Sequence, residues 1–452
     1  MTDSTAAFHQ SLVWQPQPAA AAWIARQTSR FLERQPVAAE FSRLLLQRTG
    51  TRLIDWIDHL HTDDPAGIED AGYVCAADGW WVHPGALLPP VLPATHPRML
   101  LRVDRVADFA AANGWRFPVQ TVGEPGDLLR MAFVEATEKA EFGVIERRGC
   151  NIRQPGIPLT DSERVRAEKI HERLLLRPRR FADHDEAFSS LQLLLEEAAA
   201  AIGRDLACDL FFAAERQYWQ LRNSAAQMQF MRQNSLGLGW GNHDHHTYRS
   251  SRVCFSRLIG LFESLGFVCR ERFYPGHGAG WGAQVLEHPV CPIVIFADVD
   301  LTEQELAGDF AHQPLAPSSR LGTIGLWCGL HGEALFEAGM HHLECQFDFD
   351  AARAQLAALG TASMKPFTDF SFLRQCFTEA ERWPVSAERL EQLSAAGLLT
   401  ADQAREFAHN GALGSHLEIL ERNDGYRGFN QTGITEIIQR TDPRSSLKSG
   451  PA

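Results

Sequence analysis

Three segments that lie far apart in the chain carry polar residues at alternate positions: HDHHTYR (243–249), MHHLECQ (340–346) and SHLEILER (415–422). Alternate side chains of a β-strand share one face, so His245, His342 and Glu418 each fall on the face opposite to their apolar neighbours. Polar groups on a buried face need partners. Two imidazoles and one carboxylate hold Fe(II) while leaving coordination positions open. We therefore predict a mononuclear metal site with Fe(II) as its cofactor, or another divalent ion.

The same residues have plainer interpretations. A histidine in a strand is more often a hydrogen-bonded structural residue than a metal ligand, and the 18 histidines of this chain make chance clusters common. Alternation alone does not decide which histidine of HDHH coordinates the ion. Glu344 is a rival carboxylate ligand, and Glu421 and Glu436 are weaker rivals.

Arg249 lies four residues beyond His245 on the same face of its strand, about 13 Å along it. Its planar guanidinium suits a carboxylate at the far end of a short substrate, so we predict a catalytic and substrate-binding role for Arg249. A structural ion pair with a nearby acidic residue is the alternative. Gln284 and Gln346 are further candidates for substrate contacts, and Trp281 is a candidate for the wall of the cleft.

The elements around these residues follow a repeated order in the C-terminal half, residues 236–452. Strand 243–249 precedes an amphipathic helix, RVCFSRLIGLFESLGF, and three short strands, VCRERFY, GWGAQVLE and PIVIFADVD. A second round has strand MHHLECQFDFD, helix AARAQLAALG, a helical insertion at about 370–410 and strand SHLEILER. Two βαβββ rounds predict paired modules that form a single curved sheet around a cleft.

The N-terminal half, residues 1–235, has a different pattern. AEFSRLLLQRTGTRLIDWIDHL has the apolar spacing of an amphipathic helix, and residues 161–233 look helical almost throughout. Only RMLLRV and FGVIERRG suggest strands, and the proline-rich stretch GWWVHPGALLPPVLPATHP suggests a loop. We therefore predict an α+β protein, in which a mostly helical accessory domain of unknown role precedes the metal-binding domain.

The C-terminal half also resembles a known family. NHDHHTYRSSR, RLIGLFESLGF, RERFYPG and PIVIFADVDL, in this order, resemble the 2-oxoadipate dioxygenase/decarboxylase family over about residues 236–445. His245 and Arg249 match the family's H-x-x-x-R motif, His341-His342-Leu343-Glu344 the strand that opens the second module, and Leu417 to Arg422 the late strand with its glutamate. The order of histidine, histidine and glutamate is also that of extradiol dioxygenases in the wider vicinal-oxygen-chelate superfamily.

The resemblance implies a vicinal-oxygen-chelate fold and a non-haem Fe(II) dioxygenase/decarboxylase that acts on a 2-oxo acid with O2. It implies that His245, His342 and Glu418 bind iron and that Arg249 binds a substrate carboxylate. The chain departs from the family at His341, where relatives favour asparagine, and at residues 344–346, where Glu-Cys-Gln replaces a Thr-Pro-Arg-like run. Substrate contacts from these positions therefore differ from those of the family.

Other functions fit the same residues, because a fold does not decide the reaction that it carries. A metal-dependent isomerase, lyase or extradiol dioxygenase is one alternative. A non-catalytic protein that binds a ligand is the other.

The amino-acid composition limits the kinds of partner that we expect for this protein. The formal charge of −13 makes nucleic acid or an anionic membrane surface an unfavourable partner. The nine cysteines are dispersed and form no CxxC pair, which argues against a disulfide framework and a cysteine-based zinc site. The N-terminal residues do not resemble a signal peptide, and no apolar run approaches the roughly 18 residues of a membrane span. We expect a cytoplasmic protein whose partners are a small 2-oxo acid and O2.

Overall fold

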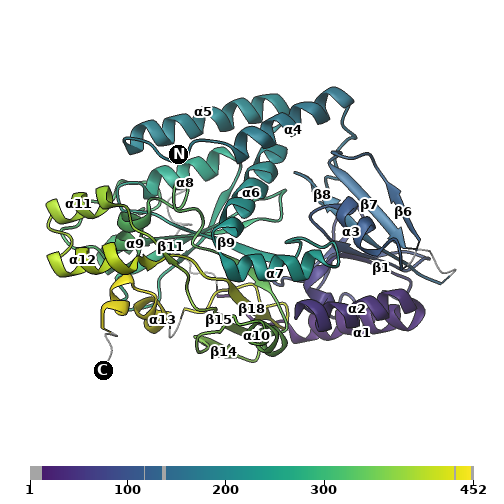
Figure 1. Cartoon of the computed structure of the whole chain (residues 1–452). Coiled ribbons are helices and arrows are strands. Elements are labelled where there is room, and N and C mark those ends of the chain that lie inside the picture. Colours follow the sequence, from purple (N-terminus) through teal and green to yellow (C-terminus); the bar gives the residue numbers. More distant parts are fainter. Residues whose placement is uncertain (1–12, 117, 135–138, 432–433, 449–452) are drawn as a thin grey trace, which may run out of the picture.

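The computed structural model describes residues 13–116, 118–134, 139–431 and 434–448. Residues 1–12, which carry most of the evidence against a signal peptide, lie outside this part. The chain builds two eight-stranded sheets, each with parallel and antiparallel pairs, which lie side by side in Figure 1. Among the described residues, no helix has both the length and the apolar character that crossing a membrane requires.

The second sheet confirms the first predicted round and the opening strand, helix and last strand of the second, and its strands run in the order β10-β11-β12-β9-β13-β18-β15-β14. The first round consists of β9 (His243–Arg249), α8 (Phe255–Ser264), β10 (Val268–Phe273), β11 (Trp281–Glu287) and β12 (Val294–Asp300). The second consists of β13 (His342–Gln346), α10 (Phe349–Ala358), β14 (Thr368–Phe370), β15 (Leu373–Phe377) and β18 (Glu418–Arg422). The opening strands β9 and β13 pair antiparallel at the centre, and each is flanked by a parallel partner, β12 or β18.

The predicted insertion at about 370–410 is helical only in its second part. Its helices are α11 (Ala387–Ala395) and α12 (Ala401–Asn410), which lie between the short strands β16 (Arg382–Trp383) and β17 (Ala412–Leu413). The first part supplies β15, which pairs with β18. Figure 1 shows α11 and α12 at the end of the molecule farthest from the first sheet.

The prediction of a mostly helical N-terminal domain is wrong, because this region contains the first sheet, with strand order β2-β3-β4-β1-β5-β8-β7-β6. Its strands are β1 (Ile57–Thr62), β2 (Val74–Cys75), β3 (Trp81–Val82), β4 (Val91–Pro93), β5 (Arg98–Arg102), β6 (Val119–Val122), β7 (Leu129–Val134) and β8 (Glu141–Arg147). The accompanying helices are α1 (Pro18–Arg34), α2 (Pro36–Thr49), η2 (Leu53–Trp56) and α3 (Val106–Asn113). Here too, two opening strands, β1 and β5, pair antiparallel at the centre, and each has a parallel outer partner.

The physical reason for the error is that a short apolar run does not reveal whether a helix or a strand contains it. The predicted helix AEFSRLLLQRTGTRLIDWIDHL breaks at Gly50, whose φ of 68° ends α2, and Ile57 to Leu60 enter β1 instead. A few apolar residues fit the spacing of a helix turn and of a buried strand equally well. The proline-rich stretch expected to be a loop contributes β3 and β4, each of two or three residues.

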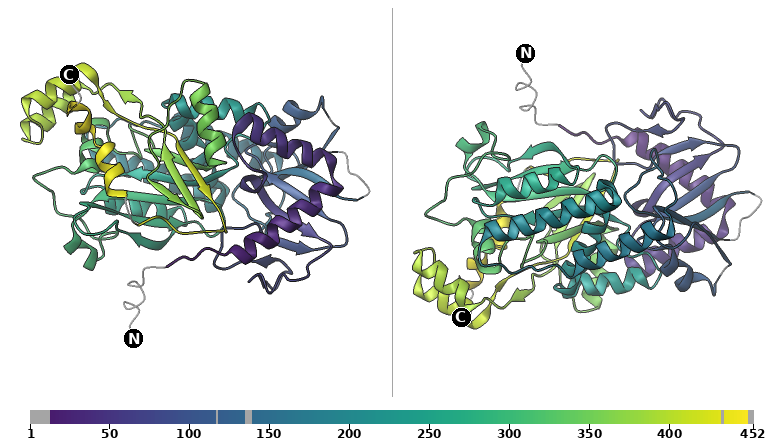
Figure 2. Two further views of the ribbon diagram at one scale, coloured as in Figure 1. Left: turned by 90° about the horizontal axis from the view of Figure 1, so that it is seen from below. Right: turned by 90° about the horizontal axis from the view of Figure 1, so that it is seen from above.

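The helical stretch 161–233 is confirmed as α4 (Asp161–Leu175), α5 (His184–Ile202), α6 (Arg204–Leu221) and α7 (Ser224–Asn234). Figures 1 and 2 show α4, α5 and α6 over the second sheet, and α1 and α2 against the first. Residues of α4, α5 and α6 share one apolar core with the second sheet. The division into residues 1–235 and 236–452 stays a prediction, although α4, α5 and α6 of the first part pack against the sheet of the second.

Packing on one face of β9 leaves the other face free for chemistry. His246 and Tyr248 face α6, where the Phe212 ring centroid lies 5.1 Å and 6.2 Å from theirs. The alternate residues His245, Thr247 and Arg249 therefore lie on the opposite face, and they line a cavity. The alternation inferred from the sequence therefore correctly predicts which residues of β9 share each face.

The turn at Gly237 allows the contact between the N-terminal and C-terminal halves of the chain to be tested by substitution. Gly237 has a φ of 71°, and a Cβ placed there would lie 2.4 Å from Phe109 Cα in α3. Gly397 has a φ of 70°, and a Cβ there would meet nothing within 4 Å. We expect Gly397→Ala to lower the free energy of unfolding by about 1 kcal/mol through backbone strain alone. Gly237→Ala should lower the free energy of unfolding by roughly 2 kcal/mol more, because the backbone of α3 or of the turn must also move.

The apparent midpoint of thermal unfolding, measured by circular dichroism for both variants, checks this difference. Equal midpoints for the two variants would mean that α3 and the turn at Gly237 are not in tight contact.

Candidate metal centre

The three predicted ligands meet on the free face of the second sheet. His342 Nδ1 lies 3.5 Å from Glu418 Oε2. Donor atoms of His245, Glu344 and Glu418 all lie within 4.8 Å of one another. All four side chains are buried, with exposed fractions of 1 to 7%. Strands β9, β13 and β18 are adjacent, so residues from three distant segments become neighbours through cross-strand pairing.

Glu344 occupies the middle of this group. Its Oε1 lies 3.1 Å from His245 Nε2 and 2.6 Å from His342 Nδ1, and it accepts a hydrogen bond of 2.5 Å from the Thr247 hydroxyl. On the neighbouring strands, Glu344 is level with His245 on one side and with Glu418 on the other. The rival ligand considered from the sequence is therefore in place as a fourth donor.

Further side chains orient these donors. His245 Nδ1 lies 2.8 Å from Asp244 Oδ1, and Arg422 binds the Asp244 carboxylate through Nε at 2.7 Å and Nη2 at 2.9 Å. We call Asp244 and Arg422 the clasp. A carboxylate at Nδ1 keeps the proton there and leaves the lone pair of Nε2 for a metal. Gln375 donates to Glu418 Oε1 at 2.8 Å and so fixes the second carboxylate.

Burial and mutual contact shift the protonation of the group. Burial alone would raise the pKa of Glu344, but His245 and His342 outweigh it and hold that pKa below its ordinary value. Burial, followed by the charge of Glu344, raises the pKa of Glu418 well above its usual range. Burial would lower the pKa of His245, but Glu344 and Asp244 raise it to about 9. Without a cation, the group thus shares protons among its members, and a divalent ion can replace those protons.

The donors open into a small cavity of about 60 Å³, which has room for roughly five water molecules. Its wall is largely aromatic: Phe273, Trp281, Phe296, Phe367, Phe377 and Phe429. Helix α13 (Ile434–Arg440) adds Ile434, Ile437 and Ile438. The arrangement suits a small molecule with polar ends and an apolar middle, held away from water.

Arg249 lies at the other end of this cavity with Asp298 and Trp281. Arg249 Nε is 3.4 Å from Asp298 Oδ2, and the two residues are paired across β9 and β12. Burial raises the pKa of Asp298 to about 7, although Arg249 opposes this rise. The expected basic residue is thus present, but it has an acidic partner.

The other sequence candidates lie away from the cavity wall. Gln284 donates to the backbone oxygens of Glu271 and Val285. Gln346 donates to Asp244 Oδ2 of the clasp at 3.0 Å and does not line the cavity. Their predicted substrate contacts therefore have no support in this arrangement.

The two weaker carboxylate rivals are also occupied elsewhere. Glu421 accepts from the Phe349 N–H at 2.7 Å, and Glu436 pairs with Arg440 on an exposed face of α13. Neither lines the cavity.

Sequence reasoning missed Asp244, Gln375 and Asp298. Two of them carry a local signal: Asp244 directly precedes the predicted ligand His245, and Asp298 interrupts the apolar strand VIFADVD. Gln375 lies in a segment predicted to be helical, so its position beside Glu418 followed only from the pairing of β15 with β18.

The first sheet repeats the clasp. In β1, His59 Nδ1 lies 2.6 Å from Asp58 Oδ1. Arg147 of β8 donates to the Asp58 carboxylate through Nε and Nη2, each at 2.9 Å from its nearer oxygen. An aspartate directly before a histidine on the opening strand, held by an arginine on the last strand of the other module, thus occurs once in each sheet.

The first sheet nevertheless lacks the acidic donors. The residues level with His59 on the neighbouring strands are Leu100 and Gly143, where the second sheet has Glu344 and Glu418. None of the clusters of three or more metal-ligating side chains found in the described part of the chain includes a residue of the first sheet. A metal site is therefore expected in the second sheet only.

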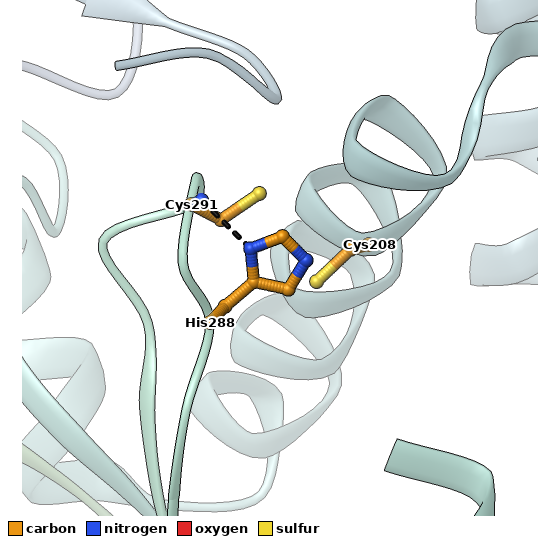
Figure 3. Close-up of side chains that lie close together, drawn as sticks. All are labelled: Cys208, His288 and Cys291. Carbon is orange, nitrogen blue, oxygen red and sulfur yellow. Dashed lines mark hydrogen bonds between the residues drawn. The ribbon is translucent and has the colours of Figure 1, made fainter. Parts of the chain in front are cut away.

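A separate cluster of Cys208, His288 and Cys291 has its donor atoms within 4.8 Å of one another (Figure 3). His288 Nδ1 accepts the backbone N–H groups of Val290 at 3.1 Å and of Cys291 at 2.8 Å, and its Nε2 lies 3.1 Å from the Leu265 carbonyl oxygen. Because backbone groups occupy both ring nitrogens, His288 retains no lone pair for a metal. We interpret this cluster as a structural support for the turn between β11 and β12.

His341 and His416 lie behind His342, with ring centroids 4.5 Å and 5.0 Å from that of His342. Burial lowers the pKa of both well below the ordinary value, so both rings are neutral. Neither lines the cavity, although donor atoms of His341, His342 and His416 lie within 4.8 Å of one another.

Comparison with known proteins leaves the chain without a family assignment: no protein-family model and no curated protein matches it. Solved structures do resemble it. A variant of 4-hydroxymandelate synthase from Streptomyces coelicolor shares 13% identity over 76% of this chain and 97% of its own, with a TM-score of 0.31. The uncharacterised protein YdcJ from Shigella flexneri, which includes domain DUF1338, shares 12% identity over 57% of this chain and 73% of its own, with a TM-score of 0.26.

Methylmalonyl-CoA epimerase from Mycobacterium tuberculosis shares 15% identity over 40% of this chain and 87% of its own, with a TM-score of 0.23. With identities and TM-scores this low, the chemistry of the site has to be inferred from its own residues.

The repeated clasp provides a matched pair of variants. We expect His245→Ala to lower the affinity for a divalent metal at least about tenfold, because a ligand is lost. His59→Ala removes the equivalent histidine of the first sheet and should leave the metal content unchanged. Elemental analysis of both proteins after anaerobic loading with Fe(II) and desalting measures this. Equal loss of metal from both variants would contradict the assignment of the site to the second sheet.

Proposed function

We propose that this protein is a non-haem Fe(II)-dependent dioxygenase/decarboxylase that acts on a small 2-oxo acid, with His245, His342 and Glu418 as the iron ligands. The observation that carries the proposal is the convergence of these buried side chains at one end of an apolar cavity, with Arg249 at the other. The donors fit the metal in type, since two imidazoles and a carboxylate suit Fe(II). They also fit in electrostatics, since buried acids crowded together gain from a cation.

Iron bound there would supply a common attachment point for the 2-oxo acid group and for O2, which makes oxidative decarboxylation accessible. The protein's own residues would do the rest. The clasp holds the Nδ1 proton of His245 so that Nε2 stays available, and Gln375 orients Glu418. The aromatic wall excludes water from the reacting end. Arg249 would fix the substrate's far end and so its position relative to the metal.

O2 consumption tests this function directly. We expect anaerobically purified protein loaded with Fe(II) to consume O2 and release CO2 in equal amounts with at least one 2-oxo acid of the C5–C8 range. An oxygen electrode and a CO2 assay measure both quantities, with Glu418→Ala as the inactive control. A complete screen with no O2 uptake above that control would rule the function out.

One observation favours a second candidate, a metal-dependent isomerase or lyase. Glu344 lies closer to both imidazoles than Glu418 does. An octahedral ion with four protein ligands keeps two open positions, enough for a chelating substrate but not for O2 as well. If Glu344 binds the metal in the active protein, chemistry that does not use O2 becomes the better assignment.

Glu344→Gln distinguishes the two candidates, with Glu418→Gln as its matched control. For the dioxygenase, we expect Glu344→Gln to keep at least about half of the bound metal and measurable O2 uptake, whereas Glu418→Gln loses about nine-tenths of the metal. Metal analysis and O2 uptake measure the outcome. Comparable loss of metal from both variants, together with activity of the wild type under argon with Mn(II), would favour the isomerase or lyase.

A further inference from the structure

The end of the cavity away from the metal donors is built around an ion pair. Arg249 and Asp298 are 1% and 3% exposed, and their side chains approach to 3.4 Å. A second carboxylate, that of Asp300, is held nearby by the backbone N–H groups of Gly322, Ile324 and Gly325. When Asp298 is ionised, the positive charge of Arg249 is therefore already balanced before any ligand arrives.

Several polar atoms at this end still need hydrogen-bond partners. Within the described part of the chain, Arg249 Nε has only the long contact of 3.4 Å with Asp298, and Arg249 Nη1, Trp281 Nε1 and Asp298 Oδ1 are buried without a hydrogen-bond partner. The first three are donors, and Asp298 Oδ1 is an acceptor when Asp298 is ionised. Leaving such groups unpaired costs about 1–3 kcal/mol each, so a ligand that pairs with them binds favourably.

The charges decide what kind of group that ligand can present. A ligand carboxylate beside Arg249 would bring a further negative charge into a buried region where Asp298 is already the direct partner of that guanidinium. A buried charge without its own partner is strongly unfavourable. An uncharged group that both donates and accepts adds no charge, and a carboxamide has both functions.

We infer that this end of the cavity binds an uncharged donor–acceptor group of the substrate, a carboxamide or a hydroxyl, and that Asp298 is the residue that excludes a second carboxylate. The inference rests on the proposed function for the placement of the 2-oxo acid group at the metal. It differs from the expectation that Arg249 binds a carboxylate, because that expectation took no account of Asp298. The substrate class is thus a 2-oxo acid with a neutral polar end.

The two halves of a carboxamide would find separate partners. Its carbonyl oxygen accepts from Arg249 Nη1 and Trp281 Nε1, and its N–H donates to Asp298 Oδ1. Asp298 is then a specificity-determining residue, which touches the substrate and leaves the metal ligands unaffected.

A pair of probes with the same shape tests the inference. N-oxalylglycine carries an oxalyl group that can chelate a metal and a carboxylate at its far end, and its primary amide replaces only that carboxylate. Binding of each to the full-length, metal-loaded protein is measured under argon by isothermal titration calorimetry. At pH 8, above the pKa of about 7 of Asp298, we expect the amide to bind at least about tenfold more tightly than the acid.

Asp298→Asn should reverse this preference, because it removes the negative charge and frees Arg249 to pair with the acid. Asp350→Asn, the same chemical change on the exposed start of α10, is the matched control and should leave the preference as in the wild type. Trp281→Phe removes the indole N–H together with part of the ring, and should weaken amide binding about threefold or more. Circular dichroism confirms that each variant is folded.

The wild-type protein alone can overturn the inference. Acid binding as tight as amide binding, or no binding of either probe, would do so, as would a folded Asp298→Asn variant with an unchanged preference. These readouts need no turnover, so they are separable from the proposed function. A preference for the amide, without O2 uptake on any 2-oxo acid, would contradict the proposed dioxygenase function but support the inferred binding of a neutral group. O2 uptake with only dicarboxylic 2-oxo acids would support the dioxygenase function and contradict the inferred binding of a neutral group.

Discussion

Burial of two carboxylates on neighbouring strands is the constraint on which the rest of this structure depends. Glu344 and Glu418 face each other across β13 and β18, away from water, where two negative charges cannot coexist without compensation. In the metal-free protein, the compensation is protonic, through His245 and a protonated Glu418. The same group is suited to a divalent cation, since a single ion can satisfy every donor at once.

The two sheets share most of their framework, and only a few residues distinguish the sheet with the candidate metal site. Both keep an aspartate–histidine pair on the opening strand and an arginine that holds the aspartate. Only the second sheet adds acids beside the histidine, whereas the first has Leu100 and Gly143 at those positions. We interpret the clasp as a structural element of the paired-module fold, and the acids as the feature that distinguishes a reactive sheet from a supporting one.

The cavity is polar at both ends, but the two ends differ in what they lack. At the metal end, acidic donors lack a cation. At the far end, Arg249 already has Asp298 as its counter-charge and lacks only hydrogen-bond partners. An aromatic wall between them keeps water from either end and limits the ligand to a few atoms in length. Chemistry at one end and selection at the other therefore depend on separate residues.

The sequence by itself determined the residues that share a face within one element, because alternation along a strand is a local property. Alternation placed His245, Arg249, His342 and Glu418 on the polar faces of their strands, whereas the family resemblance selected them as the candidate site, and apolar spacing predicted the helices of residues 161–233. Tertiary structure decided everything that depends on cross-strand register. Alignment of β13 with β9 and β18 brought Glu344 between the ligands. Pairing of β12 with β9, in turn, set an acid opposite Arg249.

The first sheet was out of reach for a related reason. Strands β2, β3 and β4 contain two or three residues each, too few to show a period, and β4 is held by its pairing with the longer strand β1. Local pattern therefore determined the candidate side chains of the site, and non-local pairing decided which of them meet.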